Sequence, residues 1–429
     1  MRILLLLITI SIFSFSFQGC NEKQINNMAP EIRISLPNEN TNFSVLDSIH
    51  IIAEFEDDVM IESVEVQLLT SLGGGVGKKL IINPGSTKYV LNTTYVIDNV
   101  LLTSGSYSLK FYATDGEKST KDLIPLSIDA VDVLVERMII LTEFQESIRV
   151  NSLENGMLEE MFTINGDYVD SRIHSFHDQL YVCGLHRLDM KAFDLNSGDT
   201  LWSAVESQNQ PFHTSDCMSF DGTEVFTSSS DGFIRGYNSA GITVFEVQLN
   251  TNNQLGQLHI TDDVVVVETI ENGTWDHYIQ HFYRYSNGEL LTYKLDMDVI
   301  DMHPIDNKNW FIVANDENAI HILKGNKNEY RAEEIEIIEG EKAISTAEFD
   351  DYIAIATENK IFAFIKNEGN IIEVSSGFQI RKIVPNKETG ELCVYSDHDL
   401  LIMSFPGGNV KDSFTFESNI LNILFDYNK

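Results

Sequence analysis

The chain has 429 residues, of which 43% are hydrophobic, so it is long enough for two or three globular domains. It carries 65 Asp and Glu against 29 Lys and Arg, and this formal net charge of −36 argues against binding to nucleic acid and against attachment to an anionic membrane through basic residues. The four cysteines show no CxxC pair and predict no disulfide framework: they are Cys20, Cys183, Cys217 and Cys393. Whether Cys183 and Cys217 pair stays open.

The first 19 residues are typical of a secretory signal peptide. Arg2 supplies one positive charge, and the apolar run from Ile3 to Phe17 follows it directly. This run is too short to span a bilayer comfortably. We therefore expect residues 1–19 to be a signal peptide that directs export of the protein.

The end of this run resembles the lipobox of bacterial lipoproteins, in which a small residue precedes a cysteine that is acylated before cleavage. Gly19 and Cys20 match that pattern, whereas Phe17 and Gln18 depart from it, as in Bacteroidota-type lipoproteins. The resemblance implies lipidation of Cys20, a polar tether over residues 20–28 and a membrane partner held through the N-terminal lipid. It implies an outer-membrane lipoprotein of the cell envelope, with exposure at the cell surface left open. The alternative is an ordinary signal peptide followed by an unrelated cysteine.

Residues 29–131 show period-two alternation of apolar and polar residues, for example over 32–36, 48–55, 61–68, 107–113 and 122–128. About seven short strands in roughly 100 residues predict a β-sandwich. The stretch resembles the immunoglobulin-like domains of bacterial surface proteins, through Ala29–Ile32 and the Tyr107 strand that ends in Asp115-Gly116. Two acidic segments, Glu56–Asp58 and Asp115–Glu117, fall at one end of such a sandwich. We predict solvated loop tips there, with a bridging calcium ion as the alternative.

From about residue 135 the chain repeats one pattern seven times, with apolar strands separated by polar loops and glycine turns. The central residues of the clearest strands recur at intervals of about 40 to 46 residues: Ile139, Tyr181, Val225, Val265, Phe311, Ile353 and Cys393. A strand repeat of this period predicts the blades of a β-propeller. The fold class expected for the whole chain is therefore all-β, with an Ig-like β-sandwich followed by a seven-bladed β-propeller over 135–429.

The first repeat has three strands, and one strand is left over after the last repeat, at Asn419–Phe425. We predict that this C-terminal strand completes the first blade and closes the ring, which hides strand edges that an open sheet would expose. The segment Ala192–Trp202 resembles the repeat of quinoprotein-like (PQQ-like, WD40-like) propellers. Enzymes of that family place an adjacent cysteine pair beside the quinone. This chain contains no Cys-Cys, so no cofactor is predicted.

No catalytic motif of a hydrolase or metalloprotease occurs in the sequence. Several residues that zinc uses lie close together along the chain: His174, His177, Cys183, His186, His213 and Cys217. Positions i and i+3 of a strand point to opposite faces, so His174 and His177 are not expected to share a metal. We predict no catalytic residue and no metal site.

With no catalytic or metal site predicted, the remaining candidate is a binding face of the predicted propeller. In a propeller, the loops between the second and third strands of each blade and the connections between blades share one mouth. The longest such loop, Ile270–Tyr278, offers two aromatic side chains in a polar loop, and aromatic residues of this kind commonly anchor a partner. The predicted partner-binding residues are Trp275, His277, Tyr278, His186, Arg187, His213 and Asp397. The alternative interpretation is that these residues form turns.

The function expected from the sequence is non-catalytic. We predict a lipid-anchored envelope protein whose propeller binds a protein or glycan partner, or scaffolds an envelope complex, without nucleic acid and without a cofactor. The alternative is a cell-surface enzyme acting on polysaccharide.

Overall fold

The computed structural model describes residues 27–154, 156–184, 190–204, 218–220, 223–229, 232–249 and 253–428. Its regular structure is 36 strands and one 3-10 turn, η1 (Ser175–His177), which confirms the all-β prediction. The chain divides into two compact units, Met1–Asp132 and Val133–Lys429. The predicted signal peptide and the lipidation site Cys20 lie outside the described residues, as does most of the tether. Among the described residues, no helix is both long enough and apolar enough to cross a membrane.

The first unit contains two sheets around one hydrophobic core. One sheet has the order β1-β3-β6 and the other the order β2-β8-β7-β4-β5. The alternation in β3 puts Ile49, Ile51, Ala53 and Phe55 into the core, as period two requires. The strands are β1 (Glu31–Leu36), β2 (Thr41–Ser44), β3 (Ser48–Ile61), β4 (Ser63–Thr70), β5 (Gly75–Ile82), β6 (Ser86–Val96), β7 (Gly105–Thr114) and β8 (Ser119–Asp129).

The acidic segment Glu56–Asp58, expected as a loop tip, lies inside β3. The register between β3 and β6 shifts between Glu56 and Ile61, so the chain bends there without leaving the strand. Asp57 at this bend is buried. The second acidic segment, Asp115–Glu117, does occupy the turn between β7 and β8.

The second unit contains seven four-stranded antiparallel sheets, which we call sheets 1 to 7 in chain order. Sheet 1 has the order β11-β10-β9-β36, and each other sheet is formed by four consecutive strands. Sheets 1 to 3 comprise β9 (Val135–Phe144), β10 (Ser147–Glu154), β11 (Met157–Asn165), β36 (Ile420–Tyr427), β12 (Asp170–His174), β13 (Gln179–Cys183), β14 (Lys191–Asp194), β15 (Thr200–Ser203), β16 (Met218–Phe220), β17 (Glu224–Ser228), β18 (Phe233–Asn238) and β19 (Thr243–Gln248).

Sheets 4 to 7 follow the same plan. Their strands are β20 (Asn253–Ile260), β21 (Val264–Glu271), β22 (His277–Tyr283), β23 (Glu289–Lys294), β24 (Asp298–Pro304), β25 (Asn309–Asn315), β26 (Ala319–Asn326), β27 (Glu333–Glu339), β28 (Ser345–Glu348), β29 (Tyr352–Ala356), β30 (Lys360–Ile365), β31 (Asn370–Ser376), β32 (Lys382–Asn386), β33 (Glu391–Tyr395), β34 (Asp399–Ser404) and β35 (Val410–Thr415). The first strands β12, β16, β20, β24, β28, β32 and β36 contact one another in a closed cycle, so they line the centre of a ring.

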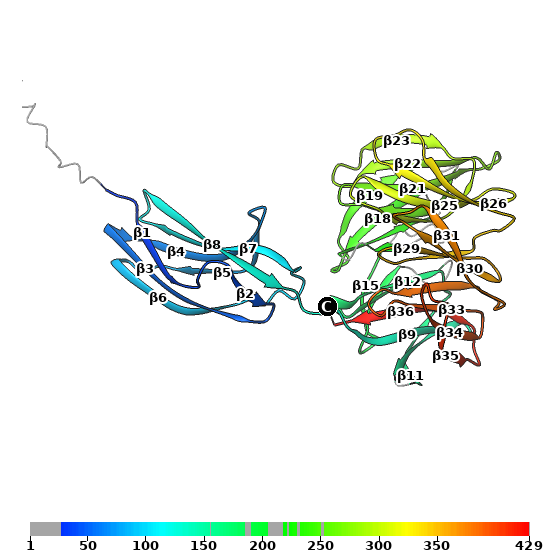
Figure 1. Ribbon diagram of the computed structural model, residues 1–429, viewed down its shortest axis with the longest axis horizontal. Coiled ribbons are helices and arrows are strands. Elements are labelled where there is room, and N and C mark those ends of the chain that lie inside the picture. The colour runs from blue at the N-terminus through cyan, green and yellow to red at the C-terminus, as the bar shows by residue number, and fades with distance from the viewer. Residues whose placement is uncertain are drawn as a thin grey trace, which may run out of the picture. The chain divides into compact units, whose positions relative to one another are not determined.

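The C-terminal strand closes this ring. Figure 1 shows β36, coloured red, beside the green β9, although almost 300 residues separate them along the chain. Their antiparallel register places Leu424 opposite Ile139, and β36 buries Ile420, Ile423 and Phe425. This is the pairing that the leftover strand predicts from the sequence.

Aromatic side chains and glycine turns pack successive sheets together. Trp202 of sheet 2 lies on the turn of sheet 3, where its Nε1 donates to Ser239 O at 3.0 Å. A Cβ on Gly241 would lie 2.7 Å from the Trp202 ring, and its φ of +75° also favours glycine. In the corresponding turn of sheet 4 the positive φ of 56° belongs to Asn287 and not to Gly288. Tyr283, which precedes this turn, is 44% exposed and does not fill space between sheets as Trp202 does.

Candidate functional site

One face of the ring, which we call the mouth, is built by two kinds of segment. The loops between the second and third strands of each sheet reach it, and so do the connections that lead from one sheet to the next. In sheet 1 the second and third strands are β9 and β10, because β36 is innermost. Three hollows open among these segments, and all of the residues that line them belong to the mouth or to the strand ends beside it.

Trp275 is presented by the hairpin between β21 and β22. Its backbone N–H donates to Glu271 O at 3.0 Å, and Glu271 N–H donates to Asp276 O at 2.9 Å, so both sides of the turn are tied together. The Thr274 hydroxyl also donates to the Glu271 carboxylate at 3.1 Å. Trp275 adopts a φ of 62° and is 64% exposed. Trp275 thus occupies the left-handed position of a hydrogen-bonded turn, as Asn287 does in the next turn of the same sheet.

Beside this ring lies the Trp275 hollow, a cavity of about 360 Å³ between sheets 4 and 5. Its lining comprises Trp275, His277, Asp296, Met297, Asp298, Asn315, Asp316, Glu317 and Lys342. Carboxylates therefore outnumber cations in it. This composition favours a ligand group that is cationic or rich in hydrogen-bond donors.

Glu268 holds His277 in place from below. The Glu268 carboxylate, 2% exposed, accepts from His277 Nδ1 at 2.7 Å, from Gln257 N–H at 3.2 Å and from Val299 N–H at 3.1 Å. A Cβ on Gly256 would lie 2.1 Å from the Glu268 carboxylate, so a larger residue at position 256 would clash with Glu268. One buried carboxylate thus joins the inner strands of sheets 4 and 5 to the first residue of β22.

The hydrogen bond from Glu268 raises the pKa of His277 above its usual value, and burial of the ring only partly opposes it. A raised folded-state pKa contributes stability that is complete below about pH 6.5, the unfolded value, and that is lost as the pH rises through the folded value. We therefore expect the melting temperature of the native protein to exceed that of His277→Gln most at pH 5.5–6.5 and to converge with it towards pH 9. His398→Gln, at an exposed mouth histidine, is the matched control. A difference between native protein and His277→Gln that does not change with pH would contradict this role for the pair.

Glu268, His277 and Asp298 offer ligand atoms that lie within 4.8 Å of one another. Such a group could hold a metal ion through mixed nitrogen and oxygen ligands. Glu268 already accepts three hydrogen bonds, two of them from backbone N–H groups, so its carboxylate is satisfied without a metal. The arrangement is that of a buried carboxylate that orients a histidine at the edge of the Trp275 hollow.

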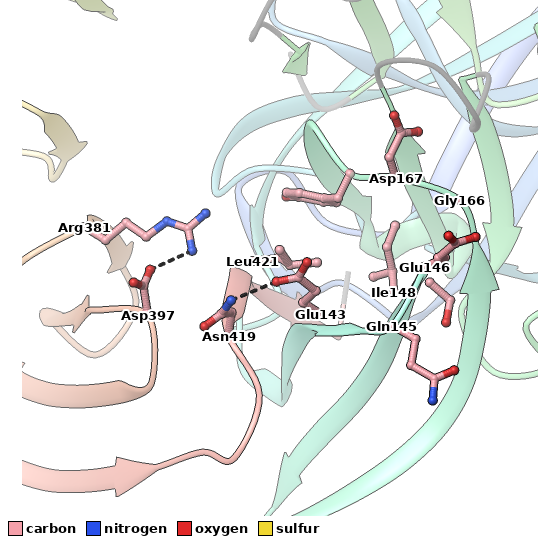
Figure 2. Close-up of a pocket in the computed structure, with 12 residues that line it drawn as sticks. Glu143, Gln145, Glu146, Ile148, Gly166, Asp167, Arg381, Asp397, Asn419 and Leu421 are labelled. Atoms are coloured by element: carbon pink, nitrogen blue, oxygen red, sulfur yellow. Dashed lines mark hydrogen bonds and ion pairs between the residues drawn. The ribbon is translucent and has the colours of Figure 1, made fainter.

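A second cavity, the Glu143 hollow, has a volume of about 580 Å³ and lies where sheets 1, 2 and 7 meet. Figure 2 shows Arg381 and Asp397 on one side of it, with Asn419 and Glu143 between them and Asp167. Arg381 Nη1 donates to Asp397 Oδ1 at 3.2 Å and to Ile420 O at 2.9 Å. The guanidinium therefore fixes the connection into the closing strand β36 at the edge of the cavity.

The third cavity, the His398 hollow, has a volume of about 590 Å³ and shares Arg381 and Asp397 with the Glu143 hollow. Its other lining residues are Ile344, Glu358, Gln379, Ile380, Ser396, His398 and Asp399. Carboxylates again outnumber the one arginine. Each of these three hollows is thus acidic, in line with the charge of the whole chain.

A half-buried lysine follows Arg381, at the start of the innermost strand of sheet 7. Lys382 Nζ donates to Asn422 Oδ1 at 3.2 Å. Burial lowers the pKa of Lys382, and the negative charges of Asp170 and Asp301 oppose this effect. Positive charge in the centre of the ring is therefore matched by carboxylates of the other inner strands.

Thr346, His303 and Asp301 are the residue types of a nucleophilic site. Their hydrogen bonds, however, do not run in the direction that activation of the Thr346 hydroxyl would require. Thr346 Oγ1 donates to Asp301 Oδ2 at 2.8 Å, and His303 Nε2 lies 2.7 Å from the same hydroxyl oxygen. Because the single hydroxyl proton of Thr346 is donated to Asp301, the hydrogen bond between His303 Nε2 and the hydroxyl oxygen is one in which His303 donates. His303 therefore does not act as a base towards Thr346, and both side chains are buried.

The structure brings three of the predicted partner-binding residues to the hollows, namely Trp275, His277 and Asp397. Tyr278 does not share the loop with Trp275, because β22 begins at His277 and pairs Tyr278 with Thr269 and Lys294. The other predicted residues lie outside the described part of the chain: His186, Arg187 and His213.

The sequence reasoning missed Glu268, Asp298 and Arg381. For Glu268 a signal existed, since a carboxylate directly after four valines in a buried strand needs a partner. The expectation that His174 and His177 point to opposite faces of a strand is wrong. The rings of His174 and His177 are 4.5 Å apart because His177 belongs to η1 and not to the strand, and the Cys183 thiol donates to Asp170 O at 3.6 Å.

No protein-family model matches the sequence, and the comparison with curated proteins found no match. Among solved structures, a protein assigned as a 6-phosphogluconolactonase from Bacteroides fragilis is 12% identical, with a TM-score of 0.51 over 67% of this chain and 97% of that chain. A quinoprotein alcohol dehydrogenase-like protein from Bacteroides thetaiotaomicron is 14% identical, with a TM-score of 0.48 over 92% of this chain and 99% of that chain. BamB from Moraxella catarrhalis is 12% identical, with a TM-score of 0.43 over 67% and 92%. At these identities the likeness is one of fold alone.

Proposed function

We propose that this protein is a non-catalytic binding protein of the cell envelope. Its seven sheets are the blades of a seven-bladed β-propeller, its first unit is an Ig-like spacer, and Cys20 carries the lipid that anchors it to the outer membrane. The propeller holds its partner at the mouth. In support of a binding role, the mouth combines three hollows with an exposed, hydrogen-bonded aromatic hairpin.

The observation that carries this proposal is Trp275. A large aromatic side chain that is 64% exposed and fixed by its own turn offers apolar contact area at a small cost in conformational entropy. The adjacent carboxylates Asp296 and Asp298 add attraction for cationic groups. We therefore propose a protein partner that presents Lys or Arg beside apolar surface, and a glycan partner is an outcome that the experiment distinguishes.

The test is a crosslinking pull-down from intact cells with the full chain, followed by a glycan array. Trp275→Ala is expected to reduce partner capture by at least about tenfold, as truncation of an interface anchor does, with an unchanged melting temperature. Tyr285→Ala is the matched control, because Tyr285 is 81% exposed but lies in the loop between the third and fourth strands of sheet 4, away from the mouth.

Three results would count against the proposal. Equal capture by Trp275→Ala and the native protein would remove the mouth as the binding face. Loss of capture together with a lower melting temperature would make Trp275 a structural residue. Hydrolysis of an array glycan by the native protein would establish an enzyme in place of a binding protein.

A further inference from the structure

Three segments of the first unit meet at one end of β3. Met28 N–H donates to Asp58 Oδ1 at 3.1 Å, so the start of the described chain is attached to the bend of β3. Asn27 Nδ2 donates to Glu117 Oε2 at 3.1 Å, which joins the same start to the turn between β7 and β8. Glu62 N–H donates to Thr114 O at 2.8 Å, which joins the bend to that turn. We call the acidic group collected there the Asp57 cluster: Asn27, Asp57, Asp58, Glu62, Asp115 and Glu117.

Asp57 is the buried member of this cluster, with 8% of its surface exposed. Its Oδ1 accepts from Val59 N–H at 2.8 Å and from Met60 N–H at 2.7 Å, which stabilises the bend. Its Oδ2 has no hydrogen-bond partner and no contact with solvent. A buried carboxylate oxygen without a partner is costly, because it has lost its hydration and gained nothing in return.

Two more oxygens of the cluster share this state. Asn27 Oδ1 and Asp115 Oδ2 are also buried atoms without a hydrogen-bond donor. Each of the three unpartnered oxygens comes from a different one of the three connected segments. Solvated loop tips do not account for them, because atoms in contact with water would find donors there.

The charge of the cluster is strongly negative. Five carboxylates belong to it, those of Asp57, Asp58, Glu62, Asp115 and Glu117, and Lys118 is the cation beside them. The Lys118 ammonium group donates to the backbone O of Asn27. A cation among these oxygens would offset their mutual repulsion.

We propose that the first unit binds one calcium ion at the Asp57 cluster, with Asp57 Oδ2, Asp115 Oδ2 and Asn27 Oδ1 among its ligands. The donor set consists of carboxylate and amide oxygens from three segments, which suits a hard cation that accepts six to eight oxygens in flexible geometry. It contains no thiolate or imidazole, the ligands that zinc prefers. The ion joins Asn27, at the end of the tether, to the body of the unit, so its binding orders the point at which the unit leaves the tether.

The test is calcium titration of the full chain, freed of metal with EDTA, by isothermal titration calorimetry and by thermal unfolding. We expect one site of submillimolar affinity, in the range of extracellular calcium modules or tighter, and a higher melting temperature in CaCl2 than in MgCl2 at equal ionic strength. Asp57→Asn and Asp115→Asn are each expected to weaken the calcium affinity at least about tenfold. Both substitutions keep the Oδ1 acceptor of the native turn, and circular dichroism in EDTA shows that each variant folds.

Asp98→Asn is the matched control, because Asp98 is exposed and follows β6 near the opposite end of β3. It is expected to bind calcium as the native protein does. Equal effects of CaCl2 and MgCl2, or an equal calcium response in native protein, Asp57→Asn and Asp115→Asn, would overturn the proposal. Either result would mean that divalent ions only screen the charge of −36.

Discussion

Removal of residues 418–429 is expected to abolish cooperative folding of the ring. The deletion removes β36, which contributes the innermost strand of sheet 1 and buries Ile420, Ile423 and Phe425. Burial of each such side chain is worth about 1.5–3 kcal/mol. The loss also leaves Arg137 without Asp426, a pair with an N···O distance of 2.8 Å and a carboxylate that is only 1% exposed. Breaking a buried pair costs about 3–5 kcal/mol, so the sum is comparable to the whole stability of about 5–15 kcal/mol of a typical protein.

Urea unfolding followed by circular dichroism, together with size-exclusion chromatography, would measure this effect. We expect aggregation of the truncated chain, because the exposed edge of β9 offers free N–H and C=O groups to other molecules. A synthetic peptide of residues 418–428 is expected to restore a folded ring when added in excess, whereas a scrambled peptide is not. A truncated chain with the unfolding transition of the native protein would contradict the closure.

The substitution Trp310→Ala is expected to destabilise the ring by about 3–5 kcal/mol, the usual cost of removing a fully buried aromatic side chain. Trp310 has no exposed surface, and its ring lies 5.1 Å from that of His281 and 5.9 Å from that of His259. A Cβ on Gly325 would lie 2.3 Å from Trp310 Nε1, so the neighbouring strand is already adapted to the indole and has no side chain to fill the space. Chemical denaturation followed by circular dichroism would measure the change.

Trp275→Ala provides the internal comparison, since it makes the same chemical change at a side chain that is 64% exposed. It is expected to change the free energy of unfolding by less than about 0.5 kcal/mol, as surface substitutions usually do. A similar loss of unfolding free energy in Trp275→Ala and Trp310→Ala would contradict the description of Trp275 as exposed and Trp310 as buried.

The repeat of the second unit could be predicted from sequence because its strands are buried on both sides. Runs such as Val264–Val267 and Phe311–Ala314 are continuously apolar, and they recur at a spacing that few folds share. The bounds were less predictable. Strand β12 ends at His174 because the chain enters the turn η1 at Ser175, and no apolar pattern marks that change. The bend inside β3 was missed for the same reason, since a charged stretch at a register shift resembles a loop in the sequence.

For the candidate site, the sequence indicated the Trp275 loop but not what surrounds it. A tryptophan in a polar hairpin can be recognised from the amino-acid sequence alone. Its neighbour Asp298 begins β24, whereas Lys342 lies on the connection between β27 and β28, and only the ring brings them to the same hollow. Arg381 likewise joins the mouth because its connection packs on Ile420 of the closing strand. Contacts of this kind depend on the pairing of distant segments and on the size of each turn, which composition does not encode locally.

The pairing of β36 with β9 also determines the order of events during synthesis. Sheet 1 has only three strands when residues 135–165 are made, and its fourth strand is supplied only after six further sheets have been translated. Contacts at such a separation form slowly, because the intervening chain must first be brought together. The ring therefore cannot reach its native state before residue 427 has left the ribosome, and until then the growing polypeptide is open to chaperones and to any machinery that handles unfolded chains.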